Sequence, residues 1–191
     1  MIQKTALVLG GGGAAGNAWL IGVVAGLAEA GLDLTELADL VVGTSAGATA
    51  AAQVRSGLSP VDLLASTLSP PPQPAGQRPK QLPSLPTEVV FERMRAIGAA
   101  ATSIIDLCQA MGVFGRESDA ILEPAAASRR AVVAARLPRT EWPARPMIVT
   151  AIDAQTGDLA AFDRDSGVDL VDAVTASTAL PGLVPTVGIN G

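Results

Sequence analysis

The chain has 191 residues, of which 49% are hydrophobic and 16% charged, with a formal net charge of -5. This composition excludes a disordered chain but leaves membrane association open, and the lack of a dense basic stretch beyond Arg129-Arg130 argues against a nucleic-acid partner. The single Cys108 allows no internal disulfide and no cysteine metal cluster, and we expect a reduced, cytoplasmic setting.

The first predicted strand, Thr5–Leu9, is followed by the glycine loop Gly10–Gly16. A helix is expected from about Ala14 to Ala30, ended by Gly31. The apolar run of the strand is broken at once by four glycines, so this start is not predicted to be a signal peptide.

A second buried strand is predicted at Leu40–Val42, followed by the loop Gly43-Thr44-Ser45-Ala46-Gly47 and a helix to about Ser56. Two apolar strands joined by a helix form a βαβ unit, which implies parallel strands. Both glycine loops then leave the same edge of the sheet. If the strands are neighbours, about 4.8 Å apart, the amides of Gly11–Gly13 and the Ser45 hydroxyl can meet around one carbonyl.

The middle of the chain is predicted to be helical on either side of a proline-rich stretch. Ser59 followed by Pro60 opens a short helix to about Leu68. Seven prolines lie in residues 70–86, which predicts an exposed, irregular loop. Helical spacing of apolar residues resumes over Thr87–Gly112, and this segment is either a mobile cover over the site or part of the buried core. A further helix is predicted over Arg129–Leu137.

The last third returns to strands. Met147–Ile152 and Leu159–Phe162 are predicted strands, joined by a turn that begins at Asp153. A helix is expected from Asp169 to about Thr178, ended by Pro181.

Ser45 is the candidate nucleophile, because the G-x-S-x-G motif lies where a strand changes to a helix. The glycines remove side chains that would clash in a tight turn, and the helix N-terminus favours a developing alkoxide. The alternative is an ordinary N-capping serine. The chain has no histidine, so a Ser-His-Asp triad cannot be built from it.

The first loop also fits the dinucleotide fingerprint Gly11-x-Gly13-x-x-Gly16. That interpretation expects an acid at the end of the second strand, where this chain has Val42-Gly43-Thr44 instead. The missing acid argues against this interpretation, so a Rossmann-type dinucleotide-binding module is kept as an alternative function. A second alternative is a non-catalytic lipid-binding fragment.

Three blocks together resemble the patatin-like phospholipases: the glycine loop after Leu9, Gly43–Ala48, and the stretch Ala176-Ser177-x-Ala179-x-Pro181-x-x-x-Pro185. The resemblance implies a three-layer α/β/α sandwich with a mainly parallel central sheet. It implies hydrolysis of lipid acyl esters, of the phospholipase A, lysophospholipase or esterase type, by a Ser-Asp dyad without metal or cofactor. Ser45 would be the nucleophile, and Gly11, Gly12 and Gly13 the oxyanion hole.

We interpret residues 1–191 as a single domain of this kind with a variable insertion at about 58–145, where no resemblance is seen. The substrate would be a lipid or another acyl ester, with peripheral contact to a membrane left open.

The chain departs from the family pattern in two places. Ala15 stands where the family often has a basic residue. The aspartate motif expected shortly after the third block is not reached at Asn190-Gly191, so the domain is interpreted as incomplete at its C-terminus, with the catalytic aspartate on a further segment. Asp153 is expected to have a structural role in a turn, and Asp172 to be solvated on a helix.

Overall fold

The computed structural model describes residues 4–69 and 83–189. The proline-rich stretch expected at 70–86 therefore lies largely outside the described residues. The described part contains a four-stranded sheet and eight α-helices, with one 3₁₀ turn at Glu123–Ala125.

The sheet has the strand order β1-β2-β3-β4. Its strands are β1 (Ala6–Leu9), β2 (Leu40–Thr44), β3 (Met147–Ile152) and β4 (Leu159–Phe162). The first three are parallel, and β4 returns antiparallel beside β3. In register, Leu9 pairs with Gly43, so the expected neighbouring strands and shared edge are confirmed.

Helix α1 (Gly13–Glu29) ends as the sequence predicts. Gly31 has φ +89°, the amide of Leu32 donates to the Leu27 carbonyl, and the amide of Gly31 donates to Ala28. This is a glycine-terminated C-cap that satisfies the last carbonyls. The following short helix α2 (Leu34–Leu37) was not predicted. Its signal is Asp33, which accepts the Thr35 amide and has Glu36 three residues on.

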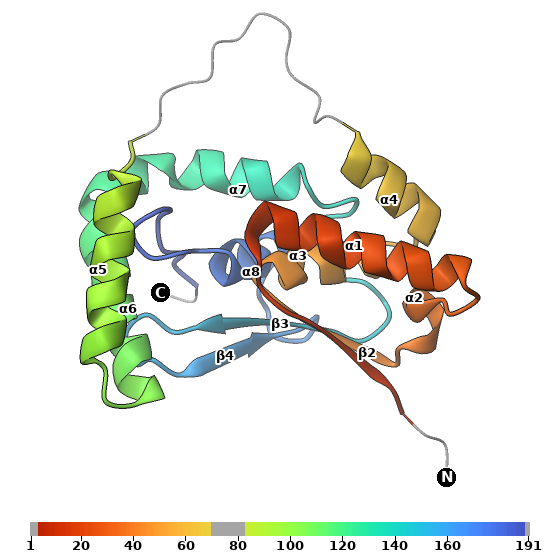
Figure 1. Cartoon of the computed structure of the whole chain (residues 1–191), viewed down its shortest axis with the longest axis horizontal. Coiled ribbons are helices and arrows are strands. Elements are labelled where there is room, and N and C mark those ends of the chain that lie inside the picture. Colours follow the sequence, from red (N-terminus) through yellow and green to blue (C-terminus); the bar gives the residue numbers. More distant parts are fainter. Residues whose placement is uncertain (1–3, 70–82, 190–191) are drawn as a thin grey trace, which may run out of the picture.

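The helices that pack on the sheet cover one face (Figure 1). Helices α3 (Ala46–Val54) and α8 (Leu170–Ser177) contact the strands directly, and α1 lies against α3 and α4 (Pro60–Leu68). One cluster of buried side chains joins them to the inward residues Leu9, Val41 and Val149. The α/β sandwich with a mainly parallel sheet is confirmed. The opposite face leaves Val8 71% exposed, so within the described residues the sandwich has helices on one side.

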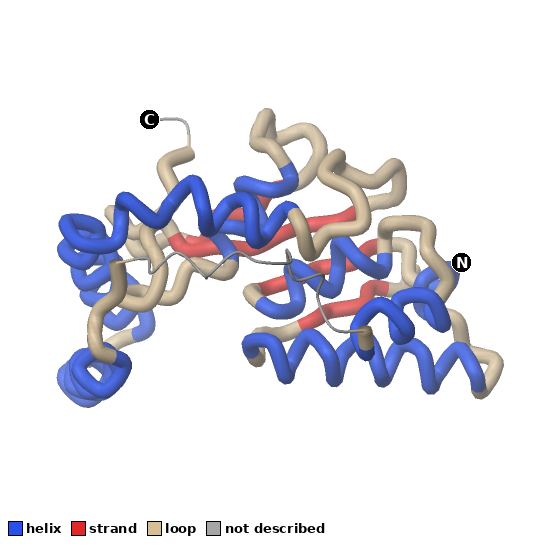
Figure 2. The backbone as a smooth tube through the Cα atoms, turned by 90° about the horizontal axis from the view of Figure 1, so that it is seen from above, coloured by secondary structure: helices blue, strands red, loops and turns tan. Residues whose placement is uncertain are grey.

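The stretch expected to be helical at Thr87–Gly112 is two helices. Helix α5 (Thr87–Ala100) ends before Ser103, whose hydroxyl caps α6 (Ile104–Leu122) by accepting the Asp106 amide. A side-chain N-cap starts a new helix even where the apolar spacing runs on, which is why periodicity alone joined them. The pair lies at one end of the sheet (Figures 1 and 2), followed by α7 (Ala126–Ala134).

Candidate active site

Ser45 lies in a strained turn between β2 and α3. Its φ of 56° and ψ of −119° make it the single non-glycine residue with positive φ among those the structure describes. Such backbone strain in a non-glycine residue is costly and is typical of functional positions. The side chain does not cap α3, so the N-cap alternative, in which the hydroxyl would bond to the helix, does not describe this serine.

Two glycines let the chain pass close to itself around Ser45. A Cβ on Gly43 would lie 2.4 Å from the Gly47 carbonyl oxygen, and one on Gly47 would lie 2.0 Å from the Leu9 carbonyl oxygen. Both contacts are with main chain, which cannot move aside. The motif glycines therefore allow the start of α3 to lie against the end of β1, whereas the sequence predicted only that they avoid clashes within the turn.

The first glycine loop lies beside the serine. A Cβ on Gly11 would meet the Ser45 Cβ at 3.6 Å and its Oγ at 4.0 Å, and one on Gly12 would lie 2.8 Å from the Gly16 Cα. The amides of Gly11, Gly12 and Gly13 donate to no other described residue, and α1 has no side-chain cap. Uncapped amides at a helix N-terminus are suited to hold a negative oxygen.

A third segment of the chain, the end of α8, forms a hydrogen bond with the turn that carries Ser45. The Ser45 amide donates to the Ser177 hydroxyl on α8 at 2.8 Å, a contact between residues 132 positions apart in the chain. Ser177 lies in the third block of the family resemblance, for which the sequence predicts no role of this serine. Its partner could not be found from sequence, because nothing local links the two serines.

Among the described residues, no carboxylate accepts a hydrogen bond from the Ser45 hydroxyl. Asp153 accepts the Thr156 amide at 3.0 Å and the Gln155 amide at 2.7 Å, and these bonds lower the pKa of its exposed carboxyl. The expected turn role of Asp153 is thus confirmed. Asp172 is not simply solvated: it binds Arg130 at 2.5 Å.

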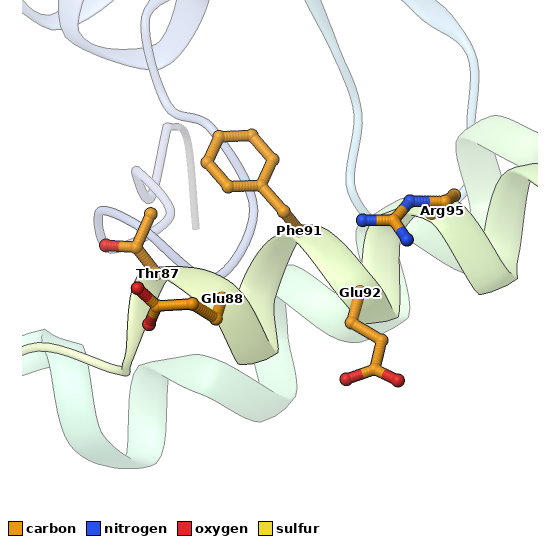
Figure 3. Close-up of a pocket in the computed structure, with 5 residues that line it drawn as sticks. All are labelled: Thr87, Glu88, Phe91, Glu92 and Arg95. Carbon is orange, nitrogen blue, oxygen red and sulfur yellow. The ribbon is translucent and has the colours of Figure 1, made fainter.

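Neither of two depressions on the surface of the described residues is lined by Ser45. One of about 490 Å³ lies along α5 and is lined by Thr87, Glu88, Phe91, Glu92 and Arg95. In Figure 3 Phe91 and Glu92 point to opposite sides of the helix, so these groups do not converge on a ligand. Another, of about 230 Å³, is lined partly by Arg55, Arg139 and Arg145, whose bonds go largely to main-chain carbonyls.

Within residues 4–69 and 83–189, no group of three or more metal-ligating side chains occurs. No helix of that part combines the length and apolar character needed to cross a bilayer.

Comparison with known proteins identifies the family. The model of the patatin-like phospholipases matches residues 7–191. Among solved structures, the type III effector protein ExoU is similar over 94% of this chain and 41% of that one, at 21% identity and a TM-score of 0.45. Full-length ExoU of Pseudomonas aeruginosa in complex with SpcU is similar over 98% and 41%, at 20% identity and a TM-score of 0.42.

This chain spans about two fifths of the length of either ExoU chain. A search of curated proteins gave no match. Because the family model covers nearly the whole sequence, the chain belongs to the patatin-like phospholipase family.

Proposed function

We propose that this protein is a serine hydrolase of lipid acyl esters in which Ser45 attacks the ester carbonyl. The observation that carries the proposal is the strained φ of Ser45 beside Gly11, at the shared edge of two parallel strands. The Gly11–Gly13 amides would bind the oxyanion that forms in the tetrahedral intermediate. Water would then release the fatty acid from the acyl-serine.

The proton of Ser45 must go to a base, and we propose that an aspartate outside residues 1–191 accepts it. Two observations support this. The chain has no histidine. The two aspartates considered as substitutes are already bonded: Asp153 accepts amides of its own turn, and Asp172 binds Arg130. A Ser-Asp dyad is what family membership leads us to expect, and the single domain of residues 1–191 would then need this further segment to be complete.

Labelling tests the nucleophile. A fluorophosphonate probe on the full-length protein should modify Ser45, as read by peptide mass mapping, and Ser45→Ala should abolish both label and ester turnover. Ser66→Ala is the matched control, because its exposed hydroxyl bonds only to the Asp62 carbonyl on α4. A label on another serine, or undiminished turnover by Ser45→Ala, would refute the assignment.

Truncation tests the base. Residues 1–191 alone should hydrolyse a short-chain nitrophenyl ester with kcat/KM lower by about 10²–10⁴ than the full-length protein. Adding the downstream segment, fused or as a second polypeptide, should restore activity. Equal values would place the base within residues 1–191.

Contact with a lipid surface is proposed for the outer side of α1. Its Trp19 is 68% exposed and Val23 37% exposed, and α1 has no charged side chain before Glu29. In residues 1–191 carrying Trp142→Phe, Trp19 is the remaining tryptophan. Its emission should shift to the blue with phosphatidylcholine vesicles; an unchanged spectrum would place the lipid contact elsewhere.

A further inference from the structure

The backbone amide of Ser45 already has a partner, the hydroxyl of Ser177 at the end of α8, 2.8 Å away. A backbone amide has one hydrogen to donate, so the Ser45 amide is not available to an oxyanion while this bond is made. The bond also fixes the direction of the Ser45 amide. Because the peptide unit is planar, it thereby fixes the plane between Thr44 and Ser45 from which the Ser45 side chain projects.

The conformation of Ser45 needs such a partner. A non-glycine residue at a φ of 56° is costly, and it persists where the surrounding structure holds it. Gly43 and Gly47 leave room for the turn, but they offer contact alone. Among residues 4–69 and 83–189, Ser177 is the single side chain that forms a hydrogen bond with Ser45. It is therefore the polar contact that can keep this turn in its strained form.

The end of α8 that carries Ser177 is itself held by two other helices. Thr178, the next residue, accepts a hydrogen bond from Nη2 of Arg129 on α7 at 2.8 Å. Further along the same segment, Asp119 on α6 accepts the Thr186 amide at 2.9 Å. Helix α7 also packs on α8 (Figure 1). Ser177 thus lies on a segment that is fixed from outside the two glycine loops, by helices from the stretch between β2 and β3.

We propose that Ser177 is a positioning residue for Ser45: its hydroxyl holds the Ser45 amide, which keeps the strained turn and directs the Ser45 hydroxyl toward the ester carbonyl. Arg129 acts one step further away, because it fixes the end of α8 on which Ser177 lies. The inference rests on the proposed acyl hydrolase function and adds two residues to it. Both act through the nucleophile rather than on the substrate.

The first test compares variants of Ser177 in the full-length protein, with kcat counted per Ser45 labelled by a fluorophosphonate. We expect Ser177→Ala to lower kcat on a nitrophenyl ester by about 10- to 100-fold with KM within about 2-fold, because a displaced nucleophile slows the chemical step. Ser177→Thr keeps a hydroxyl and should stay within about 3-fold of the wild-type kcat. The control is Ser118→Ala, whose buried hydroxyl bonds to the Phe114 carbonyl of its own helix; it should change neither constant.

The second test concerns the anchor of α8. Arg129 and Arg130 are neighbours on α7 and both bind α8, but Arg129 binds Thr178 beside Ser177, whereas Arg130 binds Asp172 in the first turn. Methionine keeps an apolar stem like that of arginine and removes the donors. We expect Arg129→Met to lower kcat by about 3- to 10-fold, the effect of losing one hydrogen bond, and Arg130→Met to leave it unchanged. Equal kcat values in the two variants would overturn the role of Arg129.

Hydrogen exchange resolved to single amides separates this inference from the function on which it rests. In Ser177→Ala the Ser45 amide should exchange about 10-fold faster or more, whereas the Val41 amide, which donates to the Pro146 carbonyl, should exchange as in the wild type. If the wild type neither hydrolyses esters nor takes the label, the proposed function fails, and faster exchange at Ser45 still shows that Ser177 holds the turn.

Unchanged exchange at Ser45, or a wild-type kcat in Ser177→Ala, would overturn the proposal. Should Ser177→Ala fail to fold, Ser177→Cys takes its place. A thiol keeps most of the volume of the side chain but is a weak hydrogen-bond acceptor, so kcat should again fall. A wild-type kcat in Ser177→Cys would overturn the proposal equally.

Discussion

The region from β1 to α3 and the pair of helices α5 and α6 use glycine in different ways. In the first region glycines allow main chain to meet main chain: eight of the nine residues of α3 are buried, and Gly47 lies against the Leu9 carbonyl. In α5, Gly98 faces open space. In α6, Gly112 again meets main chain, at the Ala154 carbonyl in the turn after β3.

The difference separates the region that forms the candidate site from the helices that pack at the end of the sheet. The first region positions a strained serine and free amides through the backbone itself. The helical pair contacts the later part of the chain at a few points: Gly112 lies against Ala154, and Asp119 accepts the amide of Thr186 at 2.9 Å. Val90 of this pair is buried. Added methyl groups should therefore be tolerated least at Gly43 and Gly47 in the first region and at Gly112 in the second, and they should be tolerated at Gly98.

The largest effect is expected from Gly47→Ala. Its Cβ would lie 2.0 Å from one main-chain oxygen, so β1 and α3 must separate. We expect a loss of about 3 kcal/mol or more in the free energy of unfolding, measured with urea. The control Gly98→Ala has open space in a helix and should gain about 0.5–1 kcal/mol. Similar losses of unfolding free energy in Gly47→Ala and Gly98→Ala would contradict the difference between the two regions.

Next in size is Gly11→Ala, which leaves the fold intact. Gly11 does not have positive φ, and its Cβ would make ordinary contacts of 3.6 and 4.0 Å with Ser45. The methyl group would displace the acyl carbonyl, and a displacement of about 1 Å typically lowers the rate about 10²-fold. The measurement is kcat on a nitrophenyl ester with the full-length protein, beside circular dichroism. Normal kcat would remove Gly11 from the oxyanion hole.

A smaller, local effect is expected from Gly112→Ala. Its Cβ would lie 2.2 Å from the Ala154 oxygen, which separates α6 from the turn between β3 and β4. We expect a loss of about 1–3 kcal/mol, with faster hydrogen exchange in residues 87–122 and unchanged protection in β1 and β2. Faster exchange throughout the sheet would show that the helical pair is not separately attached.

Hydrogen exchange also distinguishes two roles for α5 and α6, a mobile cover over the site and fixed packing against the rest of the chain. The contacts of Val90, Gly112 and Asp119 favour fixed packing. Protection across residues 83–112 should then stay the same when a non-hydrolysable lipid analogue binds. Slower exchange there on binding would favour a cover that closes over the substrate.

The smallest effect is expected from Asp153→Asn. Two amides bind the carboxylate and lower its pKa, so its contribution to stability is present above the ordinary carboxyl pKa and is lost as pH falls through the lowered value. The variant should be slightly less stable at neutral pH and equal to the wild type in strong acid, as measured by urea unfolding. Turnover should not change; a loss would make Asp153 a candidate base.

Features that depend on neighbouring residues could be predicted from the chain alone. Apolar runs followed by glycine loops predicted β1 and β2, their parallel direction and the turn at Ser45, because these follow from spacing and backbone freedom. Gly31 predicted the end of α1, and Asp153 predicted its own turn. A local motif is visible in a local stretch of sequence.

Contacts between distant residues depend on how the whole chain folds and could not be predicted from local sequence. The bond from Ser45 to Ser177, the contact of Gly112 with Ala154 and the contrast between Arg129 and Arg130 each join segments more than forty positions apart in the chain. In sequence the two arginines are equivalent neighbours. Their different charge environments arise because adjacent positions on a helix point about 100° apart, so that Arg130 reaches the acidic start of α8 and Arg129 reaches Thr178 at its end.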